Sequence, residues 1–118
     1  MKTVLVTGAT GFLGKYVVDE LVQHGYQVRA FGRNSKVGRS LENSSISFFQ
    51  GDLTKADDVL EACKGMDLVV HAGALSTVWG PWEDFYQANV LGTKHVLEAC
   101  RQAGIQRLVY VSSPSIYA

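Results

Sequence analysis

Residues 5–18 read LVTGATGFLGKYVV, and this stretch decides the fold. Three glycines, Gly8, Gly11 and Gly14, fall at three-residue intervals between an apolar run and a run with helical periodicity. Glycine adopts backbone angles that other residues avoid, and it places no side chain between the backbone and a ligand. We therefore predict a tight strand-to-helix turn at which a ligand comes close to the main chain.

Each glycine of this turn has a different expected role. Gly8 allows a sharp exit from the strand, Gly11 leaves room for a pyrophosphate, and Gly14 lets the helix press against the sheet. The start of the helix then offers unpaired amide donors and a partial positive charge to the phosphates. The spacing G-x-x-G-x-x-G is one residue longer than the G-x-G-x-x-G dinucleotide fingerprint. The alternative is a packing turn that holds no ligand.

The apolar pattern alternates between two periods along the chain. Continuous apolar runs predict strands, and i, i+3, i+4 stripes between them predict helices, which together indicate a parallel sheet covered on both faces. We predict a doubly wound α/β fold with strand order 3-2-1-4-5 and a ligand site at the carboxyl ends of the strands. The predicted strands are 3–7, 27–31, 46–50, 67–73 and 107–113, the predicted helices are 12–24, 55–64 and 83–103, and residues 34–45 form a short helix at most.

Local signals predict where the helices begin and end. Gly25, Gly65 and Gly104 follow the three predicted helices at the position of a C-terminal cap. Thr54, with Asp57 three residues later, resembles a capping box that opens the helix at 55–64.

Composition excludes several classes of protein. Eleven basic and eleven acidic side chains cancel in 118 residues, which argues against nucleic acid or a membrane surface as a partner. The apolar runs of about six residues are too short for a membrane span. Cys63 and Cys100 lack the spacing of metal ligands, so we expect no metal, and we interpret them as buried thiols of a cytoplasmic protein.

The segment TGATGFLG (7–14) resembles the cofactor turn of the extended short-chain dehydrogenase/reductase superfamily, the NAD-dependent epimerase/dehydratase family. This superfamily includes sugar-nucleotide epimerases, dihydroflavonol reductases and 3-beta-hydroxysteroid dehydrogenases. The resemblance implies a Rossmann-type dinucleotide-binding domain over residues 1–118, incomplete after the fifth strand and without the substrate domain. Four further motifs follow in register over the rest of the chain: GDL (51–53), HAGA (71–74), NVLGT (89–93) and VYVSSPSIYA (109–118).

The resemblance also implies the residues that hold the cofactor. Asp52 would bind the amino group of adenine and Leu53 would contact the ring face, although Asp52 could instead simply begin the next helix. Asn89 would stabilise the turn near the active site, and His71 is expected to be a packed strand residue rather than a base. The implied cofactor-binding residues are Gly8, Thr10, Gly11, Phe12, Leu13, Gly14, Arg33, Asp52, Leu53, Ala72, Gly73, Ala74 and Asn89.

The end of the second strand predicts which dinucleotide binds. Residues 28–36 read VRAFGRNSK, with Gly32 where NAD-preferring relatives carry an acid, and with Arg33 and Lys36 close by. An arginine there suits the 2′-phosphate of NADP, to which a guanidinium makes a two-pronged contact. We therefore predict NADP, with NAD as the alternative cofactor and an ordinary surface role as the alternative for Arg33.

The last residues carry the expected chemistry. In the resembled family a serine from the fifth strand polarises the reacting oxygen; Ser113 matches it, with Ser112 as second choice. The family's proton donor is the tyrosine of a Y-x-x-x-K pair, and Tyr117 has no residue four positions later. We expect hydride transfer between nicotinamide and a secondary alcohol or ketone, a small-molecule substrate, in the complete enzyme, and no catalysis by this chain.

Two other functions stay open at this point. One is a sugar-nucleotide epimerase or dehydratase, and the other is a non-catalytic NADP-sensing module that binds a partner protein. We also expect the chain to self-associate through the edge of the fifth strand or through its long helix.

Overall fold

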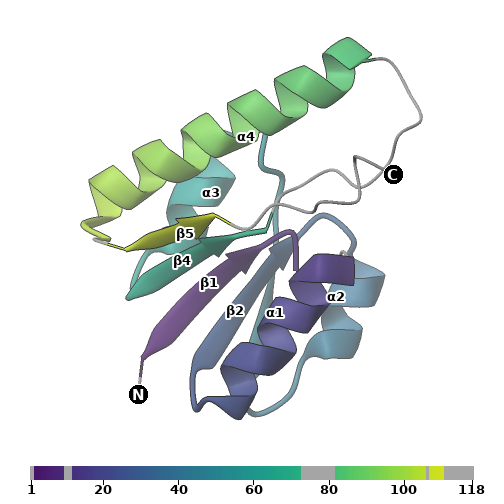
Figure 1. Ribbon diagram of the computed structural model, residues 1–118, viewed down its shortest axis with the longest axis vertical. Helices are drawn as coiled ribbons and strands as arrows, with labels where there is room; N and C mark the ends of the chain where they lie inside the picture. The colour runs from purple at the N-terminus through teal and green to yellow at the C-terminus, as the bar shows by residue number, and fades with distance from the viewer. Residues whose placement is uncertain (1, 10–11, 73–81, 106, 111–118) are drawn as a thin grey trace.

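The computed structural model describes residues 2–9, 12–72, 82–105 and 107–110. In this part of the chain the strands form one five-stranded sheet in the order β3-β2-β1-β4-β5, with every neighbouring pair parallel (Figure 1). The Rossmann-like α/β fold and the predicted order 3-2-1-4-5 are thereby confirmed. The strands are β1 (Thr3–Thr7), β2 (Gln27–Gly32), β3 (Ile46–Gln50), β4 (Leu68–His71) and β5 (Leu108–Tyr110).

Helices cover both faces of the sheet. Figure 1 shows α1 and α2 on one face and α3 and α4 on the other. The short helix α2, only weakly indicated by the sequence, is capped by Asn34, whose Oδ1 accepts a hydrogen bond from the amide of Val37 at 3.2 Å. The helices are α1 (Phe12–Gln23), α2 (Ser35–Leu41), α3 (Ala56–Cys63) and α4 (Trp82–Ala103).

Alternation along the strands divides the apolar core into two layers. On β1, Val4 and Val6 belong to the layer beneath α1, whereas Leu5 belongs to the layer beneath α3 and α4. All three are fully buried, and each contributes roughly 1.5–3 kcal/mol of transfer free energy. Because helices cover both faces of the sheet, we look for the ligand site at the carboxyl ends of the strands.

The predicted helix caps are correct at the carboxyl ends and wrong at one amino end. Gly25, Gly65 and Gly104 have φ angles of +87°, +79° and +73°, as C-terminal caps require. Thr54 does not cap α3: the N-cap is Lys55, and no side chain caps the helix there. The amide and hydroxyl of Thr54 instead donate to Oδ1 of Asp52, which forms the turn that precedes the helix.

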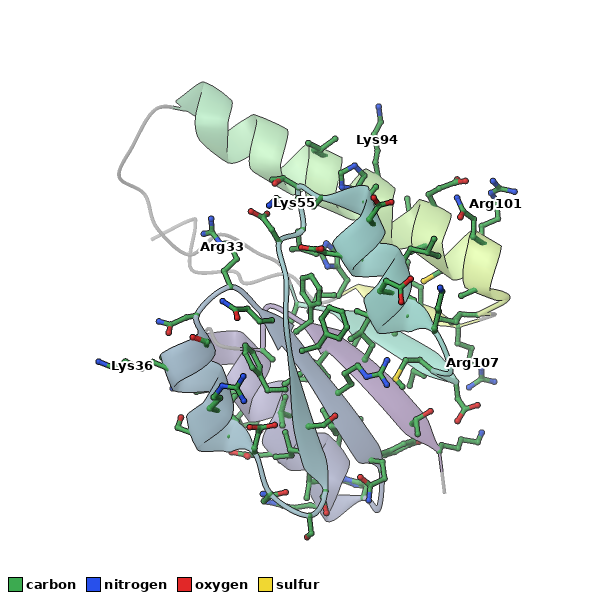
Figure 2. All side chains as sticks on the ribbon, turned by 180° about the vertical axis from the view of Figure 1, so that it is seen from behind. Arg33, Lys36, Lys55, Lys94, Arg101 and Arg107 are labelled. Atoms are coloured by element: carbon green, nitrogen blue, oxygen red, sulfur yellow. The ribbon has the colours of Figure 1, made fainter. Side chains whose placement is uncertain are left out.

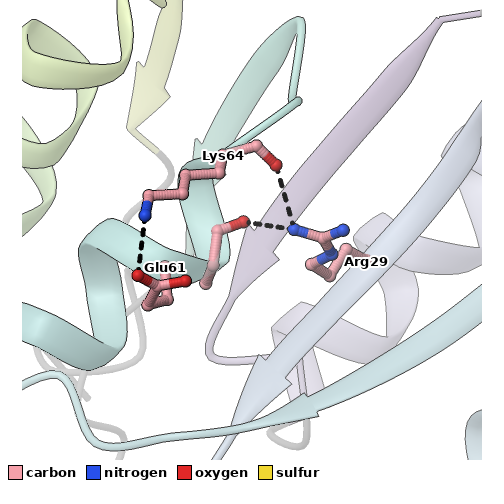
Figure 3. A network of polar contacts seen from close by, with 4 residues as sticks. Arg29, Glu61 and Lys64 are labelled. Atoms are coloured by element: carbon pink, nitrogen blue, oxygen red, sulfur yellow. Dashed lines mark hydrogen bonds and ion pairs between the residues drawn. The ribbon is translucent and has the colours of Figure 1, made fainter.

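A partly buried arginine contacts the carboxyl end of α3. Arg29, on β2, donates through Nη1 to the carbonyls of Ala62 (2.9 Å) and Lys64 (3.2 Å), which have no partner within the helix (Figure 3). Beside it, Lys64 forms an ion pair with Glu61 at 2.7 Å. The two bonds from Arg29 join the carboxyl end of α3 to β2.

The two cysteines are buried and free, as the sequence predicts. They lie in the layer between the sheet, α3 and α4, where a hydrogen bond to Cys100 and then burial raise the pKa of the Cys63 thiol. Within the described ranges no cluster of three or more potential ligands could hold a metal ion. No described helix has the length and apolar character to cross a membrane.

Candidate functional site

The turn from β1 to α1 is compressed against the start of the helix. Gly8 directly follows the strand with a φ of +69°, and the amide of Ala9 donates to the carbonyl of Phe31 on β2 at 3.2 Å. A Cβ on Gly14 would lie 1.9 Å from the carbonyl oxygen of Gly8 and 2.7 Å from the Cα of Ala9. The backbone leaving the strand therefore occupies the space that a side chain would need.

This close approach refines the predicted role of Gly14. The sequence predicts helix-to-sheet packing, whereas the contact is with the backbone of the turn itself. Thr10 and Gly11 lie outside the described residues, and Phe12 and Leu13 open α1 at the point where its amides are unpaired within the helix. Unpaired amides with the positive end of the helix dipole suit a phosphate group.

A cavity of about 360 Å³ lies at the ends of β2 and β3. The side chain of Gln50 donates to the carbonyl of Arg33 at 3.4 Å, which joins the two strand ends. Arg33 and Lys55 reach this end of the molecule from separate loops (Figure 2). The cavity is lined by Arg33, Gln50, Gly51, Asp52, Lys55 and Asp58.

Asp52 is held in place by its neighbours. Its amide donates to Oδ2 of Asp58 at 3.0 Å, and its Oδ1 accepts from the amide and hydroxyl of Thr54 at 2.9 and 2.8 Å. The two hydrogen bonds from Thr54, and then the positive charges of Arg33 and Lys55, lower the pKa of the Asp52 carboxyl below its usual 3.8. Both side-chain bonds among the described residues use Oδ1, so the ionised carboxylate presents Oδ2 to a further donor.

The second cation of this cavity is not the one indicated by the sequence. Lys36 lies near Arg33 in the chain, but it points outward from α2 and does not line the cavity (Figure 2). Lys55 lines it instead, together with Gln50 and Asp58, and the sequence analysis missed all three. The available signal was a lysine directly before the first residue of α3, where a short polar or acidic side chain is usual.

Leu53 is positioned by the long helix. A Cβ added to Gly92 of α4 would lie 3.2 Å from the Cβ of Leu53, so the two segments are in close contact. His95, also on α4, donates through Nδ1 to the carbonyl of Leu53 at 2.7 Å. Because α4 contacts both its side chain and its backbone, Leu53 has a fixed position directly after Asp52.

A buried histidine joins β1, β4 and α4. His71 is hydrogen-bonded through Nδ1 to the hydroxyl of Thr7 (2.5 Å) and through Nε2 to that of Thr93 (3.2 Å). Burial lowers the pKa of His71 below its usual 6.5. The prediction of a packed, hydrogen-bonded strand residue is confirmed.

The remaining predicted site residues lie at or beyond the end of β4. Ala72 is buried, and its amide donates to the carbonyl of Thr7 at 3.2 Å. Asn89 is part of α4, and its side chain lies outside the described part of the chain. Gly73, Ala74 and Ser113 lie outside the described residues.

Comparison with known proteins places this geometry in context. The family model "NAD dependent epimerase/dehydratase family" matches residues 4–118. Over 113 residues the chain is 44% identical to 2-alkyl-3-oxoalkanoate reductase of Stenotrophomonas maltophilia, covering 96% of this chain and 34% of that protein. Over 115 residues it is 37% identical to the decarboxylating sterol-4-alpha-carboxylate 3-dehydrogenase of Mus musculus, covering 98% and 31%. The chain thus spans about a third of the length of these relatives.

Solved structures give the same picture. A mutant uronate dehydrogenase from Agrobacterium tumefaciens, crystallised with NAD, superposes with a TM-score of 0.79 at 32% identity. The match covers 96% of this chain and 41% of that one.

Proposed function

Because this chain belongs to the NAD-dependent epimerase/dehydratase family, we propose that it is the cofactor-binding portion of an oxidoreductase that uses NADP. In the complete enzyme, hydride passes between the nicotinamide and a secondary alcohol or ketone. The contact between Gly14 and the backbone of Gly8 is the observation that carries this proposal, because it brings the first amides of α1 up to the turn. The relative named as a 3-oxoalkanoate reductase supports a ketone as the substrate class.

The described residues fit a dinucleotide at this edge of the sheet. The turn and the start of α1 supply amide donors for the diphosphate, and Asp52 presents Oδ2 toward the amino group of adenine. Leu53, fixed by α4, supplies the apolar contact for the ring. When bound, the nicotinamide supplies or accepts the hydride, and we propose that Ser113 donates a hydrogen bond to the reacting oxygen.

The end of β2 supports NADP over NAD. Gly32 is buried at the position where a carboxylate would bind the ribose hydroxyls of NAD, and the exposed Arg33 follows it beside the cavity. A guanidinium can hold a phosphate through two parallel hydrogen bonds, and Gly32 places no carboxylate at the end of β2 to repel that phosphate. We therefore propose that Arg33 contacts the 2′-phosphate.

Titration calorimetry of this chain with NADP and with NAD tests the proposed function. We expect NADP to bind more tightly, and Arg33→Gln to weaken NADP by at least tenfold while NAD changes by less than twofold. Arg107→Gln removes an exposed arginine from the other end of the molecule and serves as the matched control (Figure 2). Absence of binding to either dinucleotide would refute the proposal, and equal affinities would refute the choice of NADP.

The family description favours a second candidate, an epimerase or dehydratase of nucleotide-sugars. In that case the cofactor is recycled within each turnover and stays bound through purification. Turnover of a nucleotide-sugar by the complete protein without added cofactor would support it. Net consumption of NADPH with a ketone would support the reductase instead.

Exposed apolar side chains support the proposed self-association. Leu91 and Leu97 on α4 and Val109 on β5 are large hydrophobic residues at the surface. Sedimentation of the chain over a range of concentrations tests this proposal, and a monomer at every concentration would contradict it. We also propose that the protein is cytoplasmic.

A further inference from the structure

We propose that Lys55 is a second specificity-determining cation of the cofactor site and binds the 2′-phosphate of NADP together with Arg33. This inference rests on the proposed function and extends it to a residue in a different loop. Arg33 follows β2 and Lys55 precedes α3, so only the folded chain brings the two charges to one cavity. Figure 2 shows both side chains at the same end of the molecule.

The acidic residues of the cavity leave the two cations available. Asp58 accepts the amide of Asp52, and the Oδ1 of Asp52 accepts both donors of Thr54. Among the described residues, the ion pairs are Arg39–Glu42, Lys64–Glu61 and Arg101–Glu98, so Arg33 and Lys55 are in none of them. Their charges act on Asp52 only through space. Asp52 and Asp58 also line the cavity, so its two positive and two negative side chains balance, but neither carboxylate forms an ion pair with Arg33 or Lys55. Both cations are therefore available to contact a phosphate directly.

Lys55 has an unfavourable position for the helix that it precedes. It is the N-cap of α3, yet it provides no side-chain cap, and a cation next to a helix N-terminus opposes the helix dipole. Serine, threonine, asparagine or aspartate would stabilise the helix at this position. A residue that breaks a local rule without a local gain is expected at a functional site. The ligand, rather than the fold, accounts for the lysine.

The chemistry of lysine sets the expected behaviour. The ammonium group of Lys55 acts on a phosphate as a point charge. Replacing Lys55 by arginine should therefore retain the attraction for the phosphate, and replacing it by glutamine should abolish that attraction. Because the site is open to solvent, the contribution weakens as salt concentration rises.

Two nucleotides that differ by one phosphate isolate the effect. Adenosine 2′,5′-bisphosphate carries the 2′-phosphate, and 5′-AMP lacks it. We expect Lys55→Gln to weaken the bisphosphate about tenfold at low salt and 5′-AMP by less than twofold, and Lys55→Arg to restore the difference. Lys36→Gln is the matched control, because it removes the same charge outside the cavity.

A stability measurement separates lost binding from lost structure. Lys55→Ser introduces a favourable N-cap, so its melting temperature should equal or exceed that of the parent chain while its affinity for the bisphosphate falls. Equal weakening of both nucleotides by Lys55→Gln, no weakening of either, or an equal effect of Lys36→Gln would overturn the inference. In each of these cases a parent chain that binds NADP leaves the proposed function intact, whereas a parent chain that binds no nucleotide overturns both.

Discussion

Gly14→Ala tests whether the close contact in the β1–α1 turn is essential. The new Cβ would lie 1.9, 2.6 and 2.7 Å from the oxygen and carbon of the Gly8 carbonyl and the Cα of Ala9. Ordinary van der Waals contact begins at 3.4 Å, so the shortfall from the oxygen is 3.4 − 1.9 = 1.5 Å. All three atoms belong to the backbone and cannot rotate away. Either the helix or the turn must therefore move.

The expected loss of stability is the difference between two opposing effects. In an unobstructed helix, replacing glycine by alanine would stabilise the chain by about 1 kcal/mol. Overpacking of this kind costs about 3 kcal/mol or slightly more, which leaves a net loss of about 2 kcal/mol. For a chain of this size that loss corresponds to a fall of about 8 °C in melting temperature. The displaced turn should also weaken NADP by at least tenfold.

Gly25→Ala is the matched control at the other end of α1. A Cβ there meets nothing within 4 Å, but the φ of +87° strains any side chain by about 1–2 kcal/mol. We expect this variant to lose stability with no change in its affinity for NADP. The measurements are urea unfolding followed by circular dichroism, and calorimetric titration with NADP. A Gly14→Ala chain as stable as the parent, with undiminished affinity, would refute the reasoning from the contact.

Three further predictions follow from polar contacts. Arg29→Met removes two hydrogen bonds to carbonyls at the end of α3, so the free energy of unfolding in urea should fall by about 1–3 kcal/mol. Arg107→Met, at an exposed arginine, should lower it by less than about 0.5 kcal/mol. Because the pKa of His71 is lowered in the folded chain, the unfolded chain binds a proton first as the pH falls. The free energy of unfolding should therefore be highest above about pH 6.5 and should decrease below it, and His71→Gln should reduce this pH dependence. Thr54→Val removes the hydroxyl that donates to Asp52 and should weaken the binding of 5′-AMP severalfold, whereas Thr54→Ser should retain the affinity. An equal loss of affinity in both variants would contradict a positioning role for the hydroxyl.

Local pattern was enough to predict the strands and their order. Uninterrupted apolar runs such as those of β1 and β4 identify buried parallel strands, and right-handed crossovers then leave few possible topologies. The glycines after α1, α3 and α4 were equally predictable, because the ability to adopt a positive φ is a property of a single residue. Gly8 also has a positive φ, and its spacing from Gly14 already implies a tight turn.

Residues that act through a partner distant in the chain were not predictable in the same way. Thr54 had the spacing of a capping box, but Asp52 competes for its donors and leaves Lys55 at the helix start. Lys36 was nearer to Arg33 in sequence, yet α2 turns it away from the cavity.

The sequence by itself determined the sheet, its order and the glycine turn, because apolar periodicity and backbone freedom are local properties of the chain. Only the tertiary structure decided which side chains share the cavity at the ends of β2 and β3, and which hydroxyls hold His71. The direction of a side chain depends on how separate loops pack together. That packing is set by contacts between residues far apart in the chain, and no local pattern records it.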